Sequence, residues 1–487
     1  MLDERSVTWK VLYPPQPQDS ILAIGLDAGA LTGLARSWNR IDCVCSQEIA
    51  HLSNNLSTQL SGNIQLLPSF GHIQKKYDYV VLGSWPHSYT LNLNHITSFL
   101  TDHAFLFCLG YAGCPVRTKD LKRAGLSIIE HYAAIPYRQP KVFFPLGSRR
   151  VRAQGLKFHV PGRNRSRWIL DIAKSLSNLG CKSHLARQAL IIASAGTVPS
   201  EKETLIRWLT RKIGYPVEHL VLYTGSQSPH RKITALAIST LDKKDIVIKI
   251  GDTPLAAAAI ERESKALSRL AASSVSDNIP LWLLEDNWGH YTILVQSAFV
   301  TSHSRQIPRL TQSHFDFLTK LSHLRRNPLP LPETSYWQTI EKNLNTHSRD
   351  QLPPSLLHIV HHLKNKFSDS SSVLCHQTHG DFTPWNIKQK HKDFLVLDWE
   401  DSQEQGPAFT DIFHFLYRQA SLIGSWPGAV KLLGKFRQAN SQLARQAQYS
   451  QVDAQLNLSL WLIQEYFNRP CPHIVEMMEE HRKLSLS

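Results

Sequence analysis

Short apolar runs of strand length recur through the first part of the chain and are separated by turn-forming or helix-compatible segments. Runs of this kind predict buried strands, and their alternation with helical segments predicts an open α/β domain. In such domains a ligand binds at the carboxyl ends of the strands. The four runs lie in Ser20–Ala35, Ile41–Cys45, Tyr77–Gly83 and Ala104–Gly110.

The pattern changes after Gly196–Ser200, where we place a domain boundary. Two strands joined by a small polar turn are predicted in Leu220–Ile238, followed by a strand, a helix and another strand. Helical periods broken by prolines then dominate. The second half is therefore predicted to be α+β, with strands first and helices later. The segments that follow the first two strands are Asp245–Ile250, Asp252–Ala271, Tyr291–Ala298 and Pro308–Phe367, with a surface connector at Pro328–Pro332.

The segment His379–Ile387 concentrates polar side chains in a stretch that cannot form a regular helix, because Pro384 interrupts it. The apolar run Phe394–Leu397 predicts a strand, which places Asp398 at the strand's end. A loop and a strand end that carry Asp and Asn side chains suit phosphoryl transfer. This reaction needs a carboxylate near the acceptor hydroxyl and oxygen ligands for Mg²⁺.

His379-Gly-Asp381 with Asn386, followed by Asp398-Trp-Glu400, resembles the catalytic and metal-binding segments of the aminoglycoside phosphotransferase and choline kinase-like family. The resemblance implies a two-lobed protein-kinase-like fold. It also implies that Asp381 is the catalytic base and that Asn386 and Asp398 bind Mg²⁺. His379 would hold the loop in place. Asp411 would either support the catalytic loop, as in the family, or cap the following helix.

The same resemblance assigns the nucleotide site to the earlier strands. Lys249 would contact the phosphates of ATP and pair with Glu263, with Glu261 as the reserve partner. Gly225 and Ser226 would let backbone amides approach the phosphates. The alternatives are an edge lysine whose charge reaches solvent and an ordinary hairpin.

The first turn, with Gly25, Asp27 and Gly29, resembles the cofactor turn of class I S-adenosylmethionine-dependent methyltransferases. The resemblance implies a Rossmann-like fold, but the closely spaced glycine set is incomplete and Ser46–Glu48 offers no clear ribose-binding acid. We therefore expect residues 1–195 to be a methyltransferase-like domain that is degenerate. Binding of S-adenosylmethionine, which would make the protein a bifunctional methyltransferase and kinase, is the less favoured alternative.

Composition and charge indicate which partners and which cellular environment to expect. The net charge of +15 favours an anionic partner, and the basic tract Arg149–Arg167 is either an anion clamp or a solvated loop. Nucleic acid is not excluded, but few aromatic residues accompany the tract. The seven cysteines show no disulfide or zinc-ligand spacing. With no signal peptide and no apolar stretch of spanning length, a soluble cytoplasmic protein is expected.

Together these observations predict two domains, 1–195 and 196–487, the second with a nucleotide lobe to about residue 300 and a helical lobe beyond it. The predicted function is ATP- and Mg²⁺-dependent phosphate transfer to a hydroxyl of a small molecule, sugar or glycan. The basic charge favours an anionic or neutral acceptor. The non-enzyme alternative is a lapsed nucleotide-binding scaffold that recruits an anionic partner.

Overall fold

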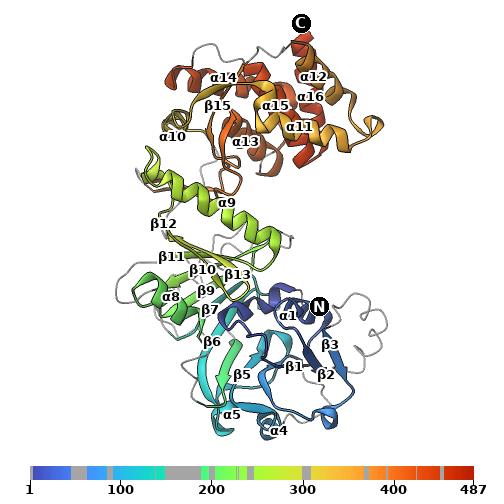
Figure 1. The fold of residues 1–487 in the computed structure, drawn as a ribbon, viewed down its shortest axis with the longest axis vertical. Coiled ribbons are helices and arrows are strands. Elements are labelled where there is room, and N and C mark those ends of the chain that lie inside the picture. The colour runs from blue at the N-terminus through green and yellow to red at the C-terminus, as the bar shows by residue number, and fades with distance from the viewer. Residues whose placement is uncertain are drawn as a thin grey trace. The chain divides into compact units, whose positions relative to one another are not determined.

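The computed structural model divides the chain into two compact units, Met1–Glu261 with Leu283–Ser302 and Arg262–Trp282 with His303–Ser487 (Figure 1). Each unit is described by itself. The structure describes residues 4–44, 63–84, 92–137, 139–147, 188–196, 203–225, 228, 230–238, 246–298, 309–366, 372–390, 393–423, 425–449 and 454–486.

The described part of the first unit is built on one 13-stranded sheet, in the order β12-β13-β11-β10-β9-β7-β6-β8-β5-β4-β1-β2-β3. Its strands are β1 (Ile21–Ile24), β2 (Ile41–Val44), β3 (Ile64–Leu67), β4 (Tyr77–Leu82), β5 (Leu100–Leu109), β6 (Ser127–Ile135), β7 (Val142–Pro145), β8 (Gln188–Ser194), β9 (His219–Tyr223), β10 (Lys232–Ile238), β11 (Ile246–Gly251), β12 (Trp282–Trp288) and β13 (Tyr291–Ser297). Its helices are η1 (Glu4–Leu12), α1 (Ala28–Ala35), η2 (Phe70–His72), α4 (Leu93–Thr97), η3 (Gly110–Ala112), α5 (Thr118–Arg123) and α8 (Leu205–Ile213).

The sheet joins two regions that the sequence presents separately. Strands β1 to β5 pair in parallel, whereas β6, β7 and β8 are antiparallel to their neighbours. Strand β7 then pairs with β9, with Phe143 opposite Leu222, and β9, β10, β11 and β13 continue as antiparallel neighbours. The predicted strands are therefore present, in one large mixed sheet. The methyltransferase-like identity of the N-terminal part stays a prediction.

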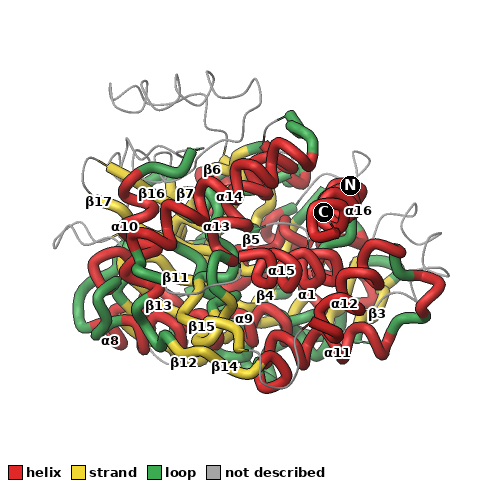
Figure 2. The backbone as a smooth tube through the Cα atoms, turned by 90° about the horizontal axis from the view of Figure 1, so that it is seen from above, coloured by secondary structure: helices red, strands yellow, loops and turns green. Residues whose placement is uncertain are grey.

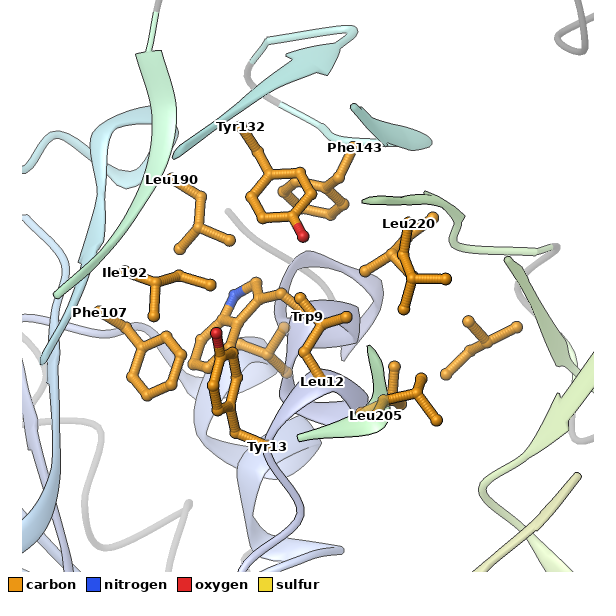
Figure 3. Packing of buried hydrophobic residues seen from close by; sticks show 14 of the residues in the cluster. Trp9, Leu12, Tyr13, Phe107, Tyr132, Phe143, Leu190, Ile192, Leu205 and Leu220 are labelled. Atoms are coloured by element: carbon orange, nitrogen blue, oxygen red, sulfur yellow. The ribbon is translucent and has the colours of Figure 1, made fainter. Parts of the chain in front are cut away.

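The N-terminal helix η1 lies in the core of this unit (Figure 3). Trp9 is fully buried, stacks on Phe107 of β5 with ring centroids 4.3 Å apart and donates its indole N–H to Tyr111 Oη at 3.1 Å. Trp288 of β12 donates to the Val11 carbonyl at 3.0 Å. One apolar cluster thus covers strands from both sides of the predicted boundary near residue 195. That boundary stays a prediction.

The second unit is mostly helical (Figure 2). Helix α9 (Pro254–Leu270) crosses the division between the units, and η4 (Ser276–Asn278) follows it. The remaining helices are α10 (Gln312–Ser322), η5 (Leu331–Glu333), α11 (Ser335–Thr346), η6 (Arg349–Gln351), α12 (Pro354–Lys366), α13 (Thr410–Arg418), the π-helical η7 (Gln419–Ile423), α14 (Ala429–Gln446), α15 (Ala454–Asn468) and α16 (Pro472–Leu486). None of the described helices is long and apolar enough to cross a membrane.

Two small sheets accompany these helices. One has the order β14-β15-β18, from β14 (Asn327–Pro330), β15 (Ser372–Thr378) and β18 (Gln403–Pro407). The other is the hairpin of β16 (Ile387–Lys390) and β17 (Asp393–Val396). The prediction of a surface connector at Pro328–Pro332 was wrong at its start, because β14 pairs with β15. Proline is tolerated there since β14 is an edge strand.

Candidate active site

The candidate catalytic loop runs from the end of β15 to the start of β16, and its backbone needs a glycine. Gly380 has φ of +83°, and a Cβ on it would lie 2.0 Å from the Asp401 carbonyl oxygen. Only glycine accommodates both conditions without movement of the backbone. Strand β17 ends at Val396, so Asp398 follows the strand end as predicted.

Asp411 holds this loop from helix α13. Its carboxylate accepts hydrogen bonds from the His379 amide at 2.9 Å and the Gly380 amide at 3.0 Å. Burial raises the pKa of Asp411, and the two amide donors oppose that rise. Of the two roles considered for Asp411, capping of the helix is wrong, because the N-cap position is Phe409. The carboxylate instead bonds the loop, which is the contact that the supporting role requires.

His379 links the loop to the segment after β17. Its Nε2 lies 2.9 Å from the Leu397 carbonyl oxygen, and its Nδ1 accepts the Asp381 amide at 3.2 Å. A carbonyl oxygen only accepts and an amide only donates. This pattern therefore selects the tautomer with hydrogen on Nε2. The imidazole thus fixes the loop backbone next to Asp381.

Only one of the two carboxylate oxygens of Asp381 accepts a hydrogen bond within the described part of the chain. Asn386 donates its Nδ2 to the Asp381 carbonyl oxygen at 3.0 Å and to Oδ2 at 2.9 Å. The other carboxylate oxygen, Oδ1, is buried and has no hydrogen-bond partner among the described residues. Burial raises the pKa of Asp381, and the negative charges of Asp401 and Asp398 also raise it, whereas the positive charge of Arg469 opposes the rise. A carboxylate placed in this way has one oxygen oriented and one available to accept a proton.

The residues expected to hold Mg²⁺ fit that ion chemically. Since Asn386 uses its Nδ2 on Asp381, its Oδ1 is the atom that can bind a cation. Asp398 has φ of +69°, a conformation that non-glycine residues adopt rarely. The described residues contain no group of three or more His, Cys, Asp or Glu side chains arranged for a metal. Mg²⁺ needs no such group, because nucleotide phosphates and water complete its ligands.

The residues predicted to bind ATP are placed as follows. Lys249 lies in β11, is 8% exposed and stands opposite Thr234 and Leu294 of the neighbouring strands. Glu263 of α9 is fully buried, whereas its reserve, Glu261, is exposed. Gly225 has φ of +74°, which a turn after β9 requires. Ser226 lies outside the described residues. The ATP-binding roles of these residues stay predictions.

The turn after β1 has a packing explanation. A Cβ on Gly25 would lie 1.7 Å from the Ser84 carbonyl oxygen, and Asp27 caps helix α1 by accepting the Ala30 amide at 3.2 Å. Gly29 is a helical residue of α1. Both the ambiguous acid region Ser46–Glu48 and the basic tract Arg149–Arg167 lie outside the described residues.

Sequence reasoning missed a polar group beside Asp381. It consists of His414 and Arg418 of α13 with Glu465 of α15. His414 Nε2 lies 4.0 Å from Asp381 Oδ1 and 3.8 Å from Glu465 Oε2, and Arg418 pairs with Glu465 at 2.5 Å. The helical spacing after Asp411 could have indicated the two α13 residues. Glu465 has no local signal, because only the packing of α15 brings it there.

Comparisons with known proteins give one family match and several similar structures. Residues 235–449 match the model of the phosphotransferase enzyme family (APH). Among solved structures, a thermostable mutant of aminoglycoside phosphotransferase APH(4)-Ia, in a ternary complex with ADP and hygromycin B, is 11% identical. The match covers 58% of this chain and 99% of that chain with a TM-score of 0.39.

Two further structures are similar at the same level. The streptomycin-ATP-APH(2")-IIa ternary complex is 13% identical over 57% of this chain and 94% of that chain, with a TM-score of 0.34. Amicoumacin kinase hAmiN in complex with AMP-PNP, Ca²⁺ and Ami is 14% identical over 52% and 84%, with a TM-score of 0.32. No curated protein sequence matches the chain. Residues 235–449 are thus a domain of the phosphotransferase enzyme family.

Proposed function

We propose that this chain is an ATP- and Mg²⁺-dependent phosphotransferase that transfers the γ-phosphoryl group to a hydroxyl of a small molecule or sugar. The observation that carries the proposal is the buried, unpaired Oδ1 of Asp381, within the segment that matches the family model. Asp411, His379 and Asn386 fix the backbone and the other carboxylate oxygen. Such a fixed carboxylate is suited to orient an acceptor hydroxyl.

In the proposed reaction the acceptor oxygen forms a bond to the γ-phosphorus while the bond from that phosphorus to the β–γ bridging oxygen breaks. ADP leaves, and the acceptor proton passes to Asp381. Asn386 and Asp398 would hold Mg²⁺, which neutralises charge on the phosphates when it is bound. Lys249 would contact the α- and β-phosphates, and Gly225 would let the backbone approach them. A cytoplasmic location remains part of the expectation.

Thermal unfolding with Mg²⁺, ATP and both together tests nucleotide binding. We expect the melting temperature of the wild type to rise only with both, and the rise to be lost in Asp398→Ala. Asp316→Ala, which removes an exposed carboxylate of α10, should behave like the wild type. If the wild type does not respond to MgATP, the ATP assignment fails and the nucleotide-binding scaffold fails with it.

A response to MgATP without transfer to any acceptor would instead favour the scaffold alternative. S-adenosylmethionine is not part of the proposal, because Asp27 caps a helix and the Ser84 backbone closely approaches Gly25. Calorimetry with that cofactor checks this point. A measurable heat of binding would restore the bifunctional alternative.

A further inference from the structure

The surroundings of Asp381 contain a polar group that the proposed phosphate transfer does not itself use. His414 and Arg418 come from α13, and Glu465 comes from α15. Arg418 and Glu465 are 5% and 2% exposed, so their charges lie away from bulk water. Buried charges of this kind need partners, and the two residues provide part of that partnership through their ion pair.

The protonation of His414 follows from its neighbour. Trp461 donates its indole N–H to His414 Nδ1 at 3.1 Å. Because indole only donates, Nδ1 must be unprotonated. Burial lowers the pKa of His414 well below its ordinary value, and Arg418 lowers it further. The imidazole is therefore neutral and carries its hydrogen on Nε2, the atom that lies closer to Asp381 and Glu465.

Some polar atoms in and next to this group have no hydrogen-bond partner. In the described parts of the chain, Asp381 Oδ1 and Arg418 Nε are buried without a hydrogen-bond partner. His414 Nε2 is 3.8 Å or more from both carboxylates, beyond hydrogen-bond length. A buried polar atom without a partner is unfavourable. His414 Nε2 and Asp381 Oδ1 are thus a donor and an acceptor 4.0 Å apart, and Arg418 Nε belongs to the neighbouring ion pair with Glu465.

A second buried histidine shows the contrast. His376 also lies in the second unit and is 5% exposed. Its Nδ1 is 2.7 Å from the Gln377 carbonyl oxygen and its Nε2 is 2.9 Å from Tyr449 Oη. Both nitrogens of His376 are satisfied within the protein, as expected for a structural residue. His314 Nε2 is also buried without a partner among the described residues, so incomplete bonding alone is not diagnostic. At His414 it lies beside the unpaired Oδ1 of Asp381, which fits a ligand-binding role.

The charges around Asp381 select the kind of ligand. Asp381 and Glu465 are acidic, whereas Arg418 is basic and Arg469 lies close enough to lower the pKa of both carboxyls. With His414 neutral, the positive charge of Arg418 and the negative charge of Glu465 balance each other in their ion pair. The group of His414, Arg418 and Glu465 therefore carries no net charge, whereas Asp398 and Asp401 add negative charge around Asp381 itself. A strongly charged acceptor would gain little net attraction from that neutral group. Hydroxyl groups both donate and accept, so they satisfy the unpaired donors and acceptor together.

We propose that His414, Arg418 and Glu465 form the acceptor subsite and that the acceptor is an uncharged polyhydroxy compound. This inference rests on the proposed function, because it names the substrate class of the same site. Of the anionic and neutral acceptors that the basic composition favours, it selects the neutral class. The overall charge of +15 describes the whole surface, whereas acceptor choice depends on groups in contact with it.

The test is a set of acceptors matched in size and different in charge. Glucose, gluconate and glucosamine are offered with MgATP at pH 7, where the amine of glucosamine is mostly protonated, together with ribose and myo-inositol as further neutral polyols. ADP formation and phosphorylated product are both measured. We expect transfer to at least one neutral polyol, with kcat/KM at least tenfold above that for charged analogues of the same size.

Variants then connect the preference to the subsite. His414→Asn and Arg418→Gln should each raise the acceptor KM at least tenfold and leave the KM for ATP within twofold. Lys435→Gln, an exposed change on α14, is the matched control. If Arg418→Gln does not fold, Arg418→Lys keeps the charge but loses the planar donor set.

The outcomes distinguish failure of the acceptor inference from failure of the proposed function. Transfer only to charged acceptors would overturn the polyhydroxy inference while the phosphotransferase proposal stands. Transfer to a neutral polyol with unchanged acceptor KM in both variants would overturn the subsite assignment. If MgATP neither stabilises the protein nor supports transfer to any compound, the proposed function and the inference fail together.

Discussion

Two glycine–acid segments of this chain look alike as sequence and differ as structure. The turn after β1 contains Gly25 and Asp27, and the loop after β15 contains Gly380 and Asp381. Both glycines have positive φ and are closely approached by a carbonyl oxygen. Asp27, however, caps its own helix. Asp381 leaves one buried oxygen unpaired, although three side chains fix the surrounding loop.

The two segments differ in the structural feature that indicates a functional site. A positive-φ glycine and an acid are the ordinary means of turning a chain and starting a helix. A buried, unpaired carboxylate oxygen in a loop whose backbone is fixed by neighbouring side chains is unfavourable for stability. Its presence therefore points to a ligand or reacting group.

The largest expected effect would follow from removing the N-terminal part. Strand β9 pairs with β7, and η1 fills the shared core. A fragment of residues 196–487 would expose that surface, so we expect it to be insoluble, or to lack a cooperative thermal transition. Circular dichroism of the purified fragment checks this. A fragment that unfolds cooperatively and binds MgATP would show that the N-terminal part is dispensable.

The next effect separates the two acids directly. Asp381→Asn should lower phosphate transfer by about 10²–10⁴-fold because it removes the proton acceptor, with little change in melting temperature. Asp27→Asn should leave transfer unchanged, since asparagine also caps helices. Initial rates on the best acceptor measure both. Equal losses of activity in the two variants would contradict the different roles of Asp381 and Asp27.

The two glycines should behave alike, because both serve the backbone. Gly380→Ala and Gly25→Ala place a Cβ against a carbonyl oxygen at positive φ, so each should destabilise the protein by about 2–4 kcal/mol. Urea unfolding gives the free energies. Gly434→Ala in helix α14, where a Cβ meets nothing within 4 Å, is the control and should stabilise by about 0.5–1 kcal/mol. Tolerance of alanine at Gly380 would contradict the loop geometry.

Asp411→Asn tests how the active loop is held. Asparagine offers one acceptor oxygen where two amides now bind, so one buried N–H loses its partner. We expect a loss of stability of about 1–3 kcal/mol, together with reduced transfer at unchanged KM for ATP. Asp316→Asn on the surface of the same unit should change neither quantity. Full activity in Asp411→Asn would mean that the loop holds its shape without this carboxylate.

The last effect concerns pH and is gradual. Burial raises the pKa of Glu465 from 4.5 to about 7. The folded state therefore binds more protons than the unfolded state between these values, and stability falls as pH rises from 4.5 to 7. Glu465→Gln cannot titrate. Its unfolding free energy relative to that of the wild type should therefore increase with pH over this range, with the slope that linkage gives for about one proton. A pH-independent difference in unfolding free energy would show that Glu465 does not titrate there.

Local patterns predicted the elements that local forces decide. The strands from β1 to β13 that the apolar runs indicated are present, and the loop containing Pro384 ends at the expected hairpin. In contrast, β14 contains two prolines and becomes a strand because β15 offers an edge to pair with. The burial of η1, with Trp9 at its centre, was not predicted, because its apolar residues do not show which strands they pack against.

By itself, the sequence determined where the proposed catalytic carboxylate, its asparagine and the second aspartate stand along the chain. Their spacing is set within twenty residues by glycine, proline and a short strand. Only the tertiary structure decided that β7 pairs with β9 in one sheet. It also decided that His414 and Glu465 lie beside Asp381. These contacts join segments far apart in the chain. They form because the packed elements bury enough apolar surface to offset the entropy of ordering them.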